Sequence, residues 1–433
     1  MGRRKKLQDN DRLYNFLHIL VNIAIKTSYR RIRFINKERI PKDAAVIFAP
    51  NHTGTLMDAM VMLAMEHKPK VFIARADVFR NPKIANILKF CKMMPIMRMR
   101  DGIEEVKKNN KTIETAADVL KDKMPLCIYP EGTHQAKYSM LPLSKGIFRI
   151  ALQAQELLGN TPLYIVPVGI KYGNFYRFRS TASVQFGNPI NVSEFIAEHS
   201  DRSAPEQINI MRELLTVRMR ENIHYIANNE EYDAKNEICA AMFGKQLKNN
   251  KQHDANPLVN LNQKTTDAVE KLQQEKPEAA EKLIALGSEA ARIRKKNGIS
   301  LKSVACPKGI VAQAARLLLL IATLPYTLFT SICTSPVTAL SRALEGKFKD
   351  KAFINSIRFV IKLLLWPLLF IAYTAVAFLC LPTLWASLVV VALLPAQAVT
   401  QDTFRAARMA VSDFKLWRNK PLQAKYDAIR KFF

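Results

Sequence analysis

Residues 45–58 read AVIFAPNHTGTLMD, an apolar run that is followed at once by a polar turn. The run 45–49 has the length and composition typical of a strand buried on both faces. A helix is expected to follow it, near residues 54–66. His52 would then stand just beyond the carboxyl end of a strand, where α/β sheets usually bind their ligands.

The same alternation of short apolar runs and helical stretches continues to about residue 190. Further strands are expected at 71–74, 126–129, 164–168 and 182–186, with helices near 82–92, 103–122 and 144–157. Strands that alternate with helices predict an α/β sheet with helices on its faces. We expect this domain to occupy residues 31–200.

The segments that flank this domain are helical in pattern. Residues 1–30 are expected to form an amphipathic, interfacial helix, since apolar positions recur at three- and four-residue steps within 11–33 and basic residues follow. Such a helix suits an anionic membrane surface, although an ordinary packing helix explains the pattern equally well. Residues 201–308 are expected to form a polar helical connector, with a linker near 245–265.

Two uncharged runs lie in the C-terminal third of the chain. Residues 363–401 form a run of 39 without a charged side chain, and residues 317–340 form a second, shorter run. A membrane-spanning helix needs about 20 apolar residues. We therefore predict an α-helical membrane region over 309–401; buried core helices are the alternative.

The loops around these runs are basic, and short basic loops prefer the cytoplasmic side of a membrane. Each uncharged run would then enter the membrane from the cytoplasmic side and return to that side. Residues 363–401 are long enough for a hairpin that turns at Pro382, whereas 317–340 is expected to be a re-entrant or interfacial pair bent near Pro325. Residues 402–433 would be a basic cytoplasmic tail, and the protein an integral membrane protein with a cytoplasmic catalytic domain.

The charge of the chain restricts its partners. Lys and Arg number 65 against 37 Asp and Glu, a net charge of +28, which favours nucleic acid, an acidic membrane or a phosphorylated substrate. Aromatic signatures of RNA recognition are missing, and no Walker or GxGxxG motif occurs. The six cysteines have neither disulfide-framework nor zinc spacing.

His52 and Asp58 are the first candidates for chemistry. A carboxylate six residues after His52, in the first turns of the next helix, could fold back onto the imidazole ring and fix its tautomer. His52 would then be a general base. Taken alone, this spacing more often has a structural role.

The sequence resembles the glycerolipid acyltransferase family, over roughly residues 13–200. His52 and Asp58 match its HxxxxD signature, with Asn51 before it, and residues 130–133 match its PEGT block. Residues 165–168 match its strand-borne proline block, and residues 96–98 look like the end of its second block. The C-terminal hydrophobic region, 309–420, also looks like that of a larger subgroup in this family.

This resemblance implies roles for individual residues. His52 would deprotonate the acceptor hydroxyl, which attacks an acyl thioester directly, and Asp58 would orient His52. Glu131, Gly132 and Thr133 would line the substrate site, and Arg98 would hold the acceptor phosphate through charge-assisted hydrogen bonds.

The third block departs from the family pattern. The family commonly has Arg-Ser where this chain has His134-Gln135, and a histidine is not a permanently charged, bidentate clamp. The phosphate would then depend on Arg98, Arg100 or Lys145. The tract around residues 141–146 looks like the glycerol-3-phosphate acylating branch, so lysophosphatidate and glycerol 3-phosphate both stay open as acceptor.

The function implied is a membrane-bound O-acyltransferase of phospholipid biosynthesis that acylates 1-acyl-sn-glycerol 3-phosphate to phosphatidate. Acyl-CoA or acyl carrier protein would be the donor, membrane lipids would be further partners, and no cofactor, metal or nucleic acid is expected. The alternative within the family is glycerol-3-phosphate O-acylation. A remote alternative is a non-catalytic basic membrane scaffold or a nucleic-acid binder, and four blocks in order argue against both.

Overall fold

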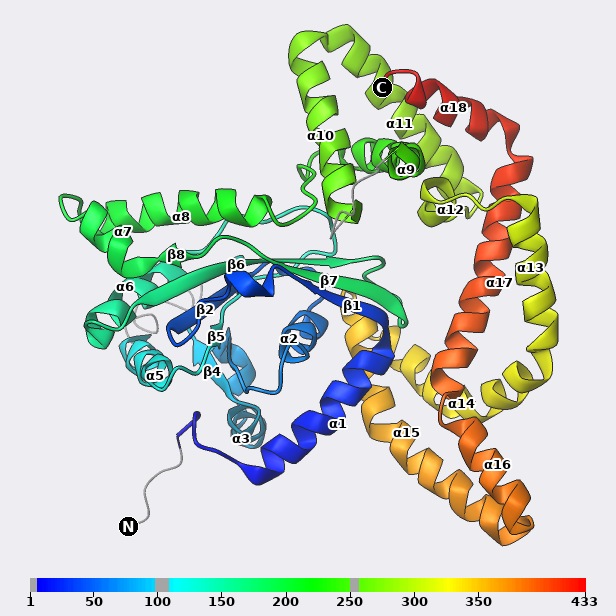
Figure 1. Cartoon of the computed structure of the whole chain (residues 1–433), viewed down its shortest axis with the longest axis horizontal. Helices are drawn as coiled ribbons and strands as arrows, with labels where there is room; N and C mark the ends of the chain where they lie inside the picture. The colour runs from blue at the N-terminus through cyan, green and yellow to red at the C-terminus, as the bar shows by residue number, and fades with distance from the viewer. Residues whose placement is uncertain (1–5, 98–108, 250–256) are drawn as a thin grey trace. The chain divides into compact units, whose positions relative to one another are not determined.

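The computed structural model describes residues 6–97, 109–249 and 257–433 (Figure 1). The chain divides into two compact units. The first comprises residues 1–136, 140–175 and 180–223, and the second comprises 137–139, 176–179 and 224–433. Two short segments within the first 223 residues, 137–139 and 176–179, therefore belong to the second unit.

The first unit is built on one mixed sheet, with strands β1 (Tyr29–Ile35), β2 (Ala45–Pro50), β3 (Val71–Arg75), β4 (Met93–Ile96), β5 (Leu126–Cys127), β6 (Leu163–Tyr172), β7 (Ser180–Phe186) and β8 (Ile190–Asn191). The order is β1-β7-β6-β2-β5-β3-β4, with β8 on β6. The pairs of β2 with β5 and β6 are parallel, as are those of β3 with β4 and β5. The predicted α/β fold is confirmed.

The sheet is covered by helices α1 (Arg12–Ser28), α2 (Leu56–Leu63), α3 (Pro82–Phe90), α5 (Asn109–Lys121), α6 (Gly146–Leu158), α7 (Val192–Glu198) and α8 (Ala204–Arg220). Figure 1 shows α8 along one face and α2, α3 and α5 along the other. Apolar side chains of β2 and β6, such as Ile47 and Val166, are fully buried. Burial on both faces explains why these strands read as continuous apolar runs.

Two strands differ from the sequence-based expectation. The helical pattern expected over 11–33 ends at Ser28, and Tyr29–Ile35 is strand β1, which pairs in parallel with β7. Pairing with a strand some 150 residues away overrides the local helical pattern. β4 (Met93–Ile96) is a strand that the sequence pattern does not predict, and it ends at the first residue of 96–98, the end of the second block. The first part of the helix predicted at 103–122 falls outside the described residues.

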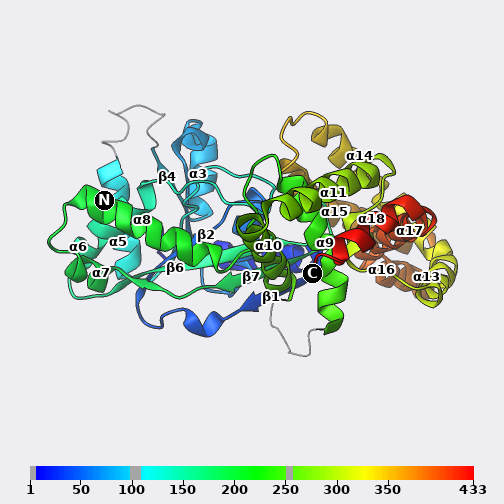
Figure 2. The ribbon, with the colours of Figure 1, turned by 90° about the horizontal axis from the view of Figure 1, so that it is seen from above.

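The second unit is helical, with α9 (Tyr232–Asn249), α10 (Pro257–Glu275), α11 (Pro277–Lys296), α12 (Leu301–Ala305), α13 (Ile310–Ala322), α14 (Leu324–Glu345), α15 (Phe353–Cys380), α16 (Thr383–Leu393), α17 (Ala396–Arg418) and α18 (Lys420–Arg430) (Figure 2). The linker expected at 245–265 is helical through Asn249 and again from Pro257. The polar residues at 245–249 and 257–265 are therefore part of α9 and α10.

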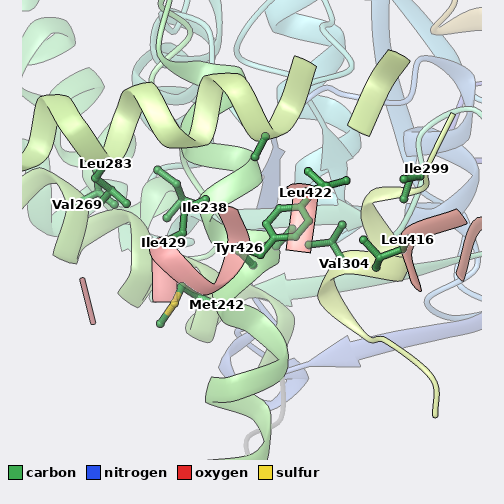
Figure 3. Packing of buried hydrophobic residues seen from close by; sticks show 13 residues of the cluster. Ile238, Met242, Val269, Leu283, Ile299, Val304, Leu416, Leu422, Tyr426 and Ile429 are labelled. Carbon is green, nitrogen blue, oxygen red and sulfur yellow. The ribbon is translucent and has the colours of Figure 1, made fainter. Parts of the chain in front are cut away.

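The C-terminal segment 402–433, which we expect to be a basic cytoplasmic tail, is helical and packed. Leu422, Tyr426 and Ile429 of α18 are buried against Ile238 of α9 and Leu283 of α11 (Figure 3). These side chains join residues separated by almost 200 positions into one apolar core.

The uncharged runs form helices of unequal length. α15 (Phe353–Cys380) has 28 residues and is long and apolar enough to cross a membrane by itself. Two bent pairs pass the same length and composition test only when joined, namely α13 with α14 at 62° and α16 with α17 at 55°. The first bend lies at Thr323, next to Pro325, and the second at Leu394 and Pro395. The second arm of the expected hairpin is therefore broken, and it continues into the polar part of α17.

Candidate active site

Asn51 fixes the chain where it leaves β2. Its amide nitrogen donates to the carbonyl of Ile170 at 3.1 Å, and its amide oxygen accepts the Ile170 N–H at 2.6 Å. The side chain thus takes the place of the next backbone hydrogen bonds between the parallel strands β2 and β6. His52 follows directly, outside the sheet edge.

His52 and Asp58 form the hydrogen-bonded pair that the sequence predicted. Nδ1 of His52 lies 2.7 Å from Oδ2 of Asp58. Asp58 has no exposed side-chain surface, whereas the side chain of His52 is 18% exposed. Because the carboxylate oxygen is an acceptor, Nδ1 carries the proton and Nε2 is left as the basic nitrogen. Among the described residues, no hydrogen-bond partner contacts Nε2.

The carboxylate of Asp58 is satisfied on both oxygens. Oδ2 also accepts the backbone N–H groups of Thr53 and Gly54, at 2.8 and 2.7 Å. Oδ1 accepts the hydroxyl of Tyr172, on β6, at 2.7 Å. These bonds offset the cost of burying a carboxylate. They also hold it in one position against the imidazole.

Gly54 is required by this arrangement. A Cβ atom at this position would lie 2.7 Å from Oδ1 of Asp58 and 2.8 Å from the Tyr172 ring. Thr55, which follows, has φ of 52°, a conformation that costs free energy in a residue other than glycine. The tight turn between β2 and α2 is therefore shaped by the packing of the carboxylate.

Glu131, in the PEGT block, makes a hydrogen bond to the HxxxxD block. Its Oε1 accepts the backbone N–H of His52 at 2.8 Å, and its Oε2 accepts that of Leu141 at 2.7 Å. The residue is only 6% exposed. Burial raises the pKa of Glu131 to about 7, against the opposing effect of the two N–H donors. With both oxygens engaged by backbone, Glu131 positions the two loops rather than projecting into an open site.

The rest of the third motif surrounds the imidazole ring. The ring of Tyr129 stacks on His52 with centroids 4.3 Å apart, and the ring of His134 meets it edge-on at 5.5 Å. Gly132 has φ of +65°, which favours glycine, and Thr133 is exposed. His134 therefore lies next to the His52–Asp58 pair.

Lys145 is exposed at the N-cap of α6, next to the third motif. The N–H of Ser144 donates to the carbonyl of Pro130 at 2.7 Å, which places the start of α6 beside the PEGT loop. The side chain of Ile96, at the end of β4, lies 3.4 Å from the position of a Cβ on Gly146. Arg98 and Arg100 lie outside the described residues.

Two aromatic residues of the site were missed in the sequence. Tyr129 immediately precedes the third motif, so its proximity to His52 could have been suspected from that position. Tyr172 lies on β6 six residues after Val166, and only the strand pairing brings it to Asp58. Burial raises the pKa of Tyr172 well above its ordinary value, so its hydroxyl remains a donor. No cluster of metal ligands occurs in the part of the chain that the structure describes.

Comparison with known proteins finds acyltransferases. Residues 31–171 match the family model described as Acyltransferase. The chain is 36% identical over 73 residues to glycerol-3-phosphate O-acyltransferase 1 of Saccharomyces cerevisiae, which is 17% of this chain and 10% of that protein. It is 29% identical over 171 residues to a 1-acyl-sn-glycerol-3-phosphate acyltransferase of Cocos nucifera, 39% of this chain and 51% of that protein.

A bacterial relative is matched over more of its length. The 1-acyl-sn-glycerol-3-phosphate acyltransferase of Bacillus subtilis is 24% identical over 193 residues, 44% of this chain and 87% of that protein. The crystal structure of the 1-acyl-sn-glycerophosphate (LPA) acyltransferase from Thermotoga maritima is similar at a TM-score of 0.35 and 18% identity, over 49% of this chain and 82% of that one. The yeast and coconut relatives are matched over only a tenth to about half of their length. Residues 31–171 therefore match the acyltransferase family model, and the relatives compared above are named glycerol-phosphate acyltransferases.

Proposed function

We propose that the protein transfers a fatty acyl group from an acyl thioester to the free hydroxyl of 1-acyl-sn-glycerol 3-phosphate, which makes phosphatidate. The observation that carries this proposal is the His52–Asp58 pair at 2.7 Å, with Nε2 of His52 unengaged among the described residues. The pair stands in a domain that matches the acyltransferase family.

The reaction needs one base and no covalent enzyme intermediate. Nε2 of His52 takes the proton of the acceptor hydroxyl as its oxygen attacks the thioester carbonyl. The resulting tetrahedral intermediate collapses, the C–S bond breaks, and the thiolate leaves with the proton returned by the imidazolium. Asp58 stabilises that imidazolium through Nδ1–H, as the carboxylate of a catalytic triad does. Nearby cysteines are not required as nucleophiles.

The acceptor phosphate would lie on the side of His52 that carries His134 and the start of α6. The ring of His134 contacts that of His52 edge-on, with centroids 5.5 Å apart, so a phosphate bound by His134 would lie close to His52. Lys145 is exposed at that helix start, and the N–H groups of a helix N-terminus favour an anion. We assign the main phosphate contact to Arg98, with Lys145 and His134 in support.

Acylation of glycerol 3-phosphate is the second candidate. Yeast relatives that are 36% and 30% identical over short segments are named glycerol-3-phosphate O-acyltransferases. The tract around residues 141–146, which looks like the glycerol-3-phosphate acylating branch, supports the same candidate. The two reactions share every residue discussed above, so only the acceptor distinguishes them.

We place the protein in the membrane, with its catalytic domain on the cytoplasmic side. α15 is long enough to cross, and the two bent pairs suit re-entrant or broken spans. Acyl-CoA or acyl carrier protein would then reach His52 from the cytoplasm. The basic loops on either side of the uncharged runs support this orientation.

The test is acyl transfer by the purified full-length protein in nonionic detergent, with radiolabelled acyl-CoA or acyl carrier protein as donor. 1-Acyl-sn-glycerol 3-phosphate, glycerol 3-phosphate and 1-acylglycerol without phosphate are offered in turn. The expected result is label in phosphatidate from the first acceptor only. Label in 1-acylglycerol 3-phosphate would move the assignment to the second candidate. No transfer to either phosphorylated acceptor from either donor would contradict both.

A further inference from the structure

A short segment of the second unit, Tyr176–Arg179, holds the polar end of α15. The carbonyl of Tyr176 accepts a hydrogen bond from Arg358 at 3.0 Å. The ring of Phe178 lies under the ammonium of Lys362, which is 2.9 Å from the ring centroid. Lys362 is the last charged residue before the uncharged run 363–401.

The same segment holds α17 at the other end of that run. The guanidinium of Arg179 donates a hydrogen bond to the carboxylate of Asp402 at 2.8 Å. The backbone carbonyl of Arg179 accepts a hydrogen bond from Arg405 at 2.9 Å. Asp402 is the first charged residue after the uncharged run. The two ends of the run are therefore brought to one place by four consecutive residues.

Around Tyr176–Arg179, positively charged side chains outnumber the carboxylates that could neutralise them. Arg358 is neutralised by Glu345, at 2.6 and 2.8 Å, and Arg179 by Asp402. Four further cations make no described ion pair, and we call them the basic site: Arg177, Arg342, Lys362 and Arg408. Lys362 does experience the negative charge of Glu345, but that carboxylate is already paired with Arg358. Arg408 experiences the positive charges of Arg177, Arg342 and Arg358, so these side chains form one electrostatic cluster.

Lys362 lies at the point where the basic site meets the exposed apolar surface of α15. Leu364, Leu368 and Ile371 follow it along α15, each more than 60% exposed. A lysine on an apolar helix at the level of the membrane surface is costly unless an anion accompanies it, and such residues commonly mark binding sites. Here its described contact is an aromatic ring, which stabilises the cation but does not neutralise it.

We propose that the basic site binds the phosphate of an anionic glycerophospholipid of the surrounding membrane. The phosphate oxygens would accept hydrogen bonds from Lys362 and the neighbouring guanidinium groups, while the acyl chains lie along the exposed apolar face of α15. Arginine and lysine donors at one point suit a phosphate. A lipid with a quaternary ammonium would bind less well, because its own cation meets a site that already carries excess positive charge.

The experiment measures lipid binding directly, so its result does not depend on acyl transfer by His52. Full-length protein in nonionic detergent is titrated into trace phosphatidylglycerol with a fluorescent acyl chain, and anisotropy is followed; phosphatidylcholine with the same chain is the comparison. We expect clear preference for phosphatidylglycerol. Lys362→Met should weaken its binding roughly tenfold, the loss typical of one hydrogen bond to a charged group, and Lys362→Arg should restore most of it.

Lys282→Met is the matched control, because Lys282 is an exposed lysine on α11 outside the basic site. It should bind phosphatidylglycerol as the unaltered protein does. Equal binding by Lys362→Met and Lys282→Met, or equal binding of the two lipids, would overturn the proposal. Glycerol 3-phosphate, inorganic phosphate and coenzyme A are added as competitors at millimolar concentration. Displacement of the lipid by any of them would assign the site to a soluble phosphate instead.

Discussion

The hydroxyl of Tyr172 donates a 2.7 Å hydrogen bond to Oδ1 of Asp58, across 114 positions of sequence. The other oxygen of the same carboxylate holds Nδ1 of His52. The His52–Asp58 pair is therefore held in place from β6, the strand that also fixes Asn51 through Ile170. The first two predictions concern this connection.

His52→Ala should abolish acyl transfer while the protein still folds and remains in the membrane, and Asp58→Asn should be nearly as damaging. Base catalysis is worth roughly 10²–10⁴ in rate. Turnover is measured on purified protein, with His67→Ala, an exposed histidine, as the control. If His52→Ala keeps more than about a tenth of normal turnover, the general-base role is wrong.

Tyr172→Phe should lower kcat about tenfold and leave the acceptor KM nearly unchanged, since it removes one hydrogen bond to a buried carboxylate. In an Asp58→Asn background the same change should have little further effect. Tyr164→Phe, on the same strand, is the control, because its hydroxyl faces Asn191 instead. Additive losses in the double variant would mean that Tyr172 does not act through Asp58.

Glu131 should make the folded protein less stable as pH rises from about 4.5 to about 7. Its pKa is raised to about 7 in the fold, so the native state holds a proton that the unfolded chain has released over this range. The whole shift corresponds to about 3 kcal/mol of unfolding free energy, lost between the two pKa values. Thermal unfolding of the purified protein at pH 5 and at pH 8 measures this loss of stability.

The control for this prediction is Glu131→Gln. The variant is expected to be less stable at every pH, because an amide cannot accept both backbone N–H groups. The informative quantity is the slope, since the variant should lose the part of the pH dependence that belongs to the carboxyl. Identical pH dependence in the two proteins would show that Glu131 titrates near its ordinary pKa.

Arg98→Ala should mainly raise the acceptor KM, with a smaller effect on the donor KM, because the phosphate loses a charge-assisted donor. His134→Arg should be tolerated, since it restores the residue that the family commonly has there. Steady-state kinetics with each substrate varied in turn provide the measurement. An unchanged acceptor KM in Arg98→Ala would move the phosphate contact elsewhere, with Lys145 tested next.

The loop between α14 and α15 should stay on the cytoplasmic side if α13 and α14 form a re-entrant pair. A single probe cysteine is placed at Lys349, which is exposed, in a variant without the six native cysteines. An impermeant thiol reagent added to intact cells should leave it unlabelled and should label it after the membrane is opened. Labelling in intact cells would contradict the re-entrant assignment, because the loop would have crossed.

Much of the site can be predicted from local sequence. The strand at 45–49, the turn that follows it and the helix start that carries Asp58 lie within fourteen consecutive residues, so their periodicity and spacing already place the carboxylate near His52. The strands at 71–74 and 164–168 follow in the same way, because burial on both faces makes each a continuous apolar run.

Long-range packing accounts for the rest. Tyr29–Ile35 reads locally as the end of a basic helix, and it becomes a strand because β7 offers a paired edge. The segment 402–433 reads as a basic tail, yet Leu422 and Tyr426 are buried in a core built from α9 and α11. Tyr172 at Asp58, and Tyr176–Arg179 at both ends of the uncharged run, have no local signature. Their partners lie more than a hundred residues away, and free energy from such contacts depends on chain topology, which a local pattern does not encode.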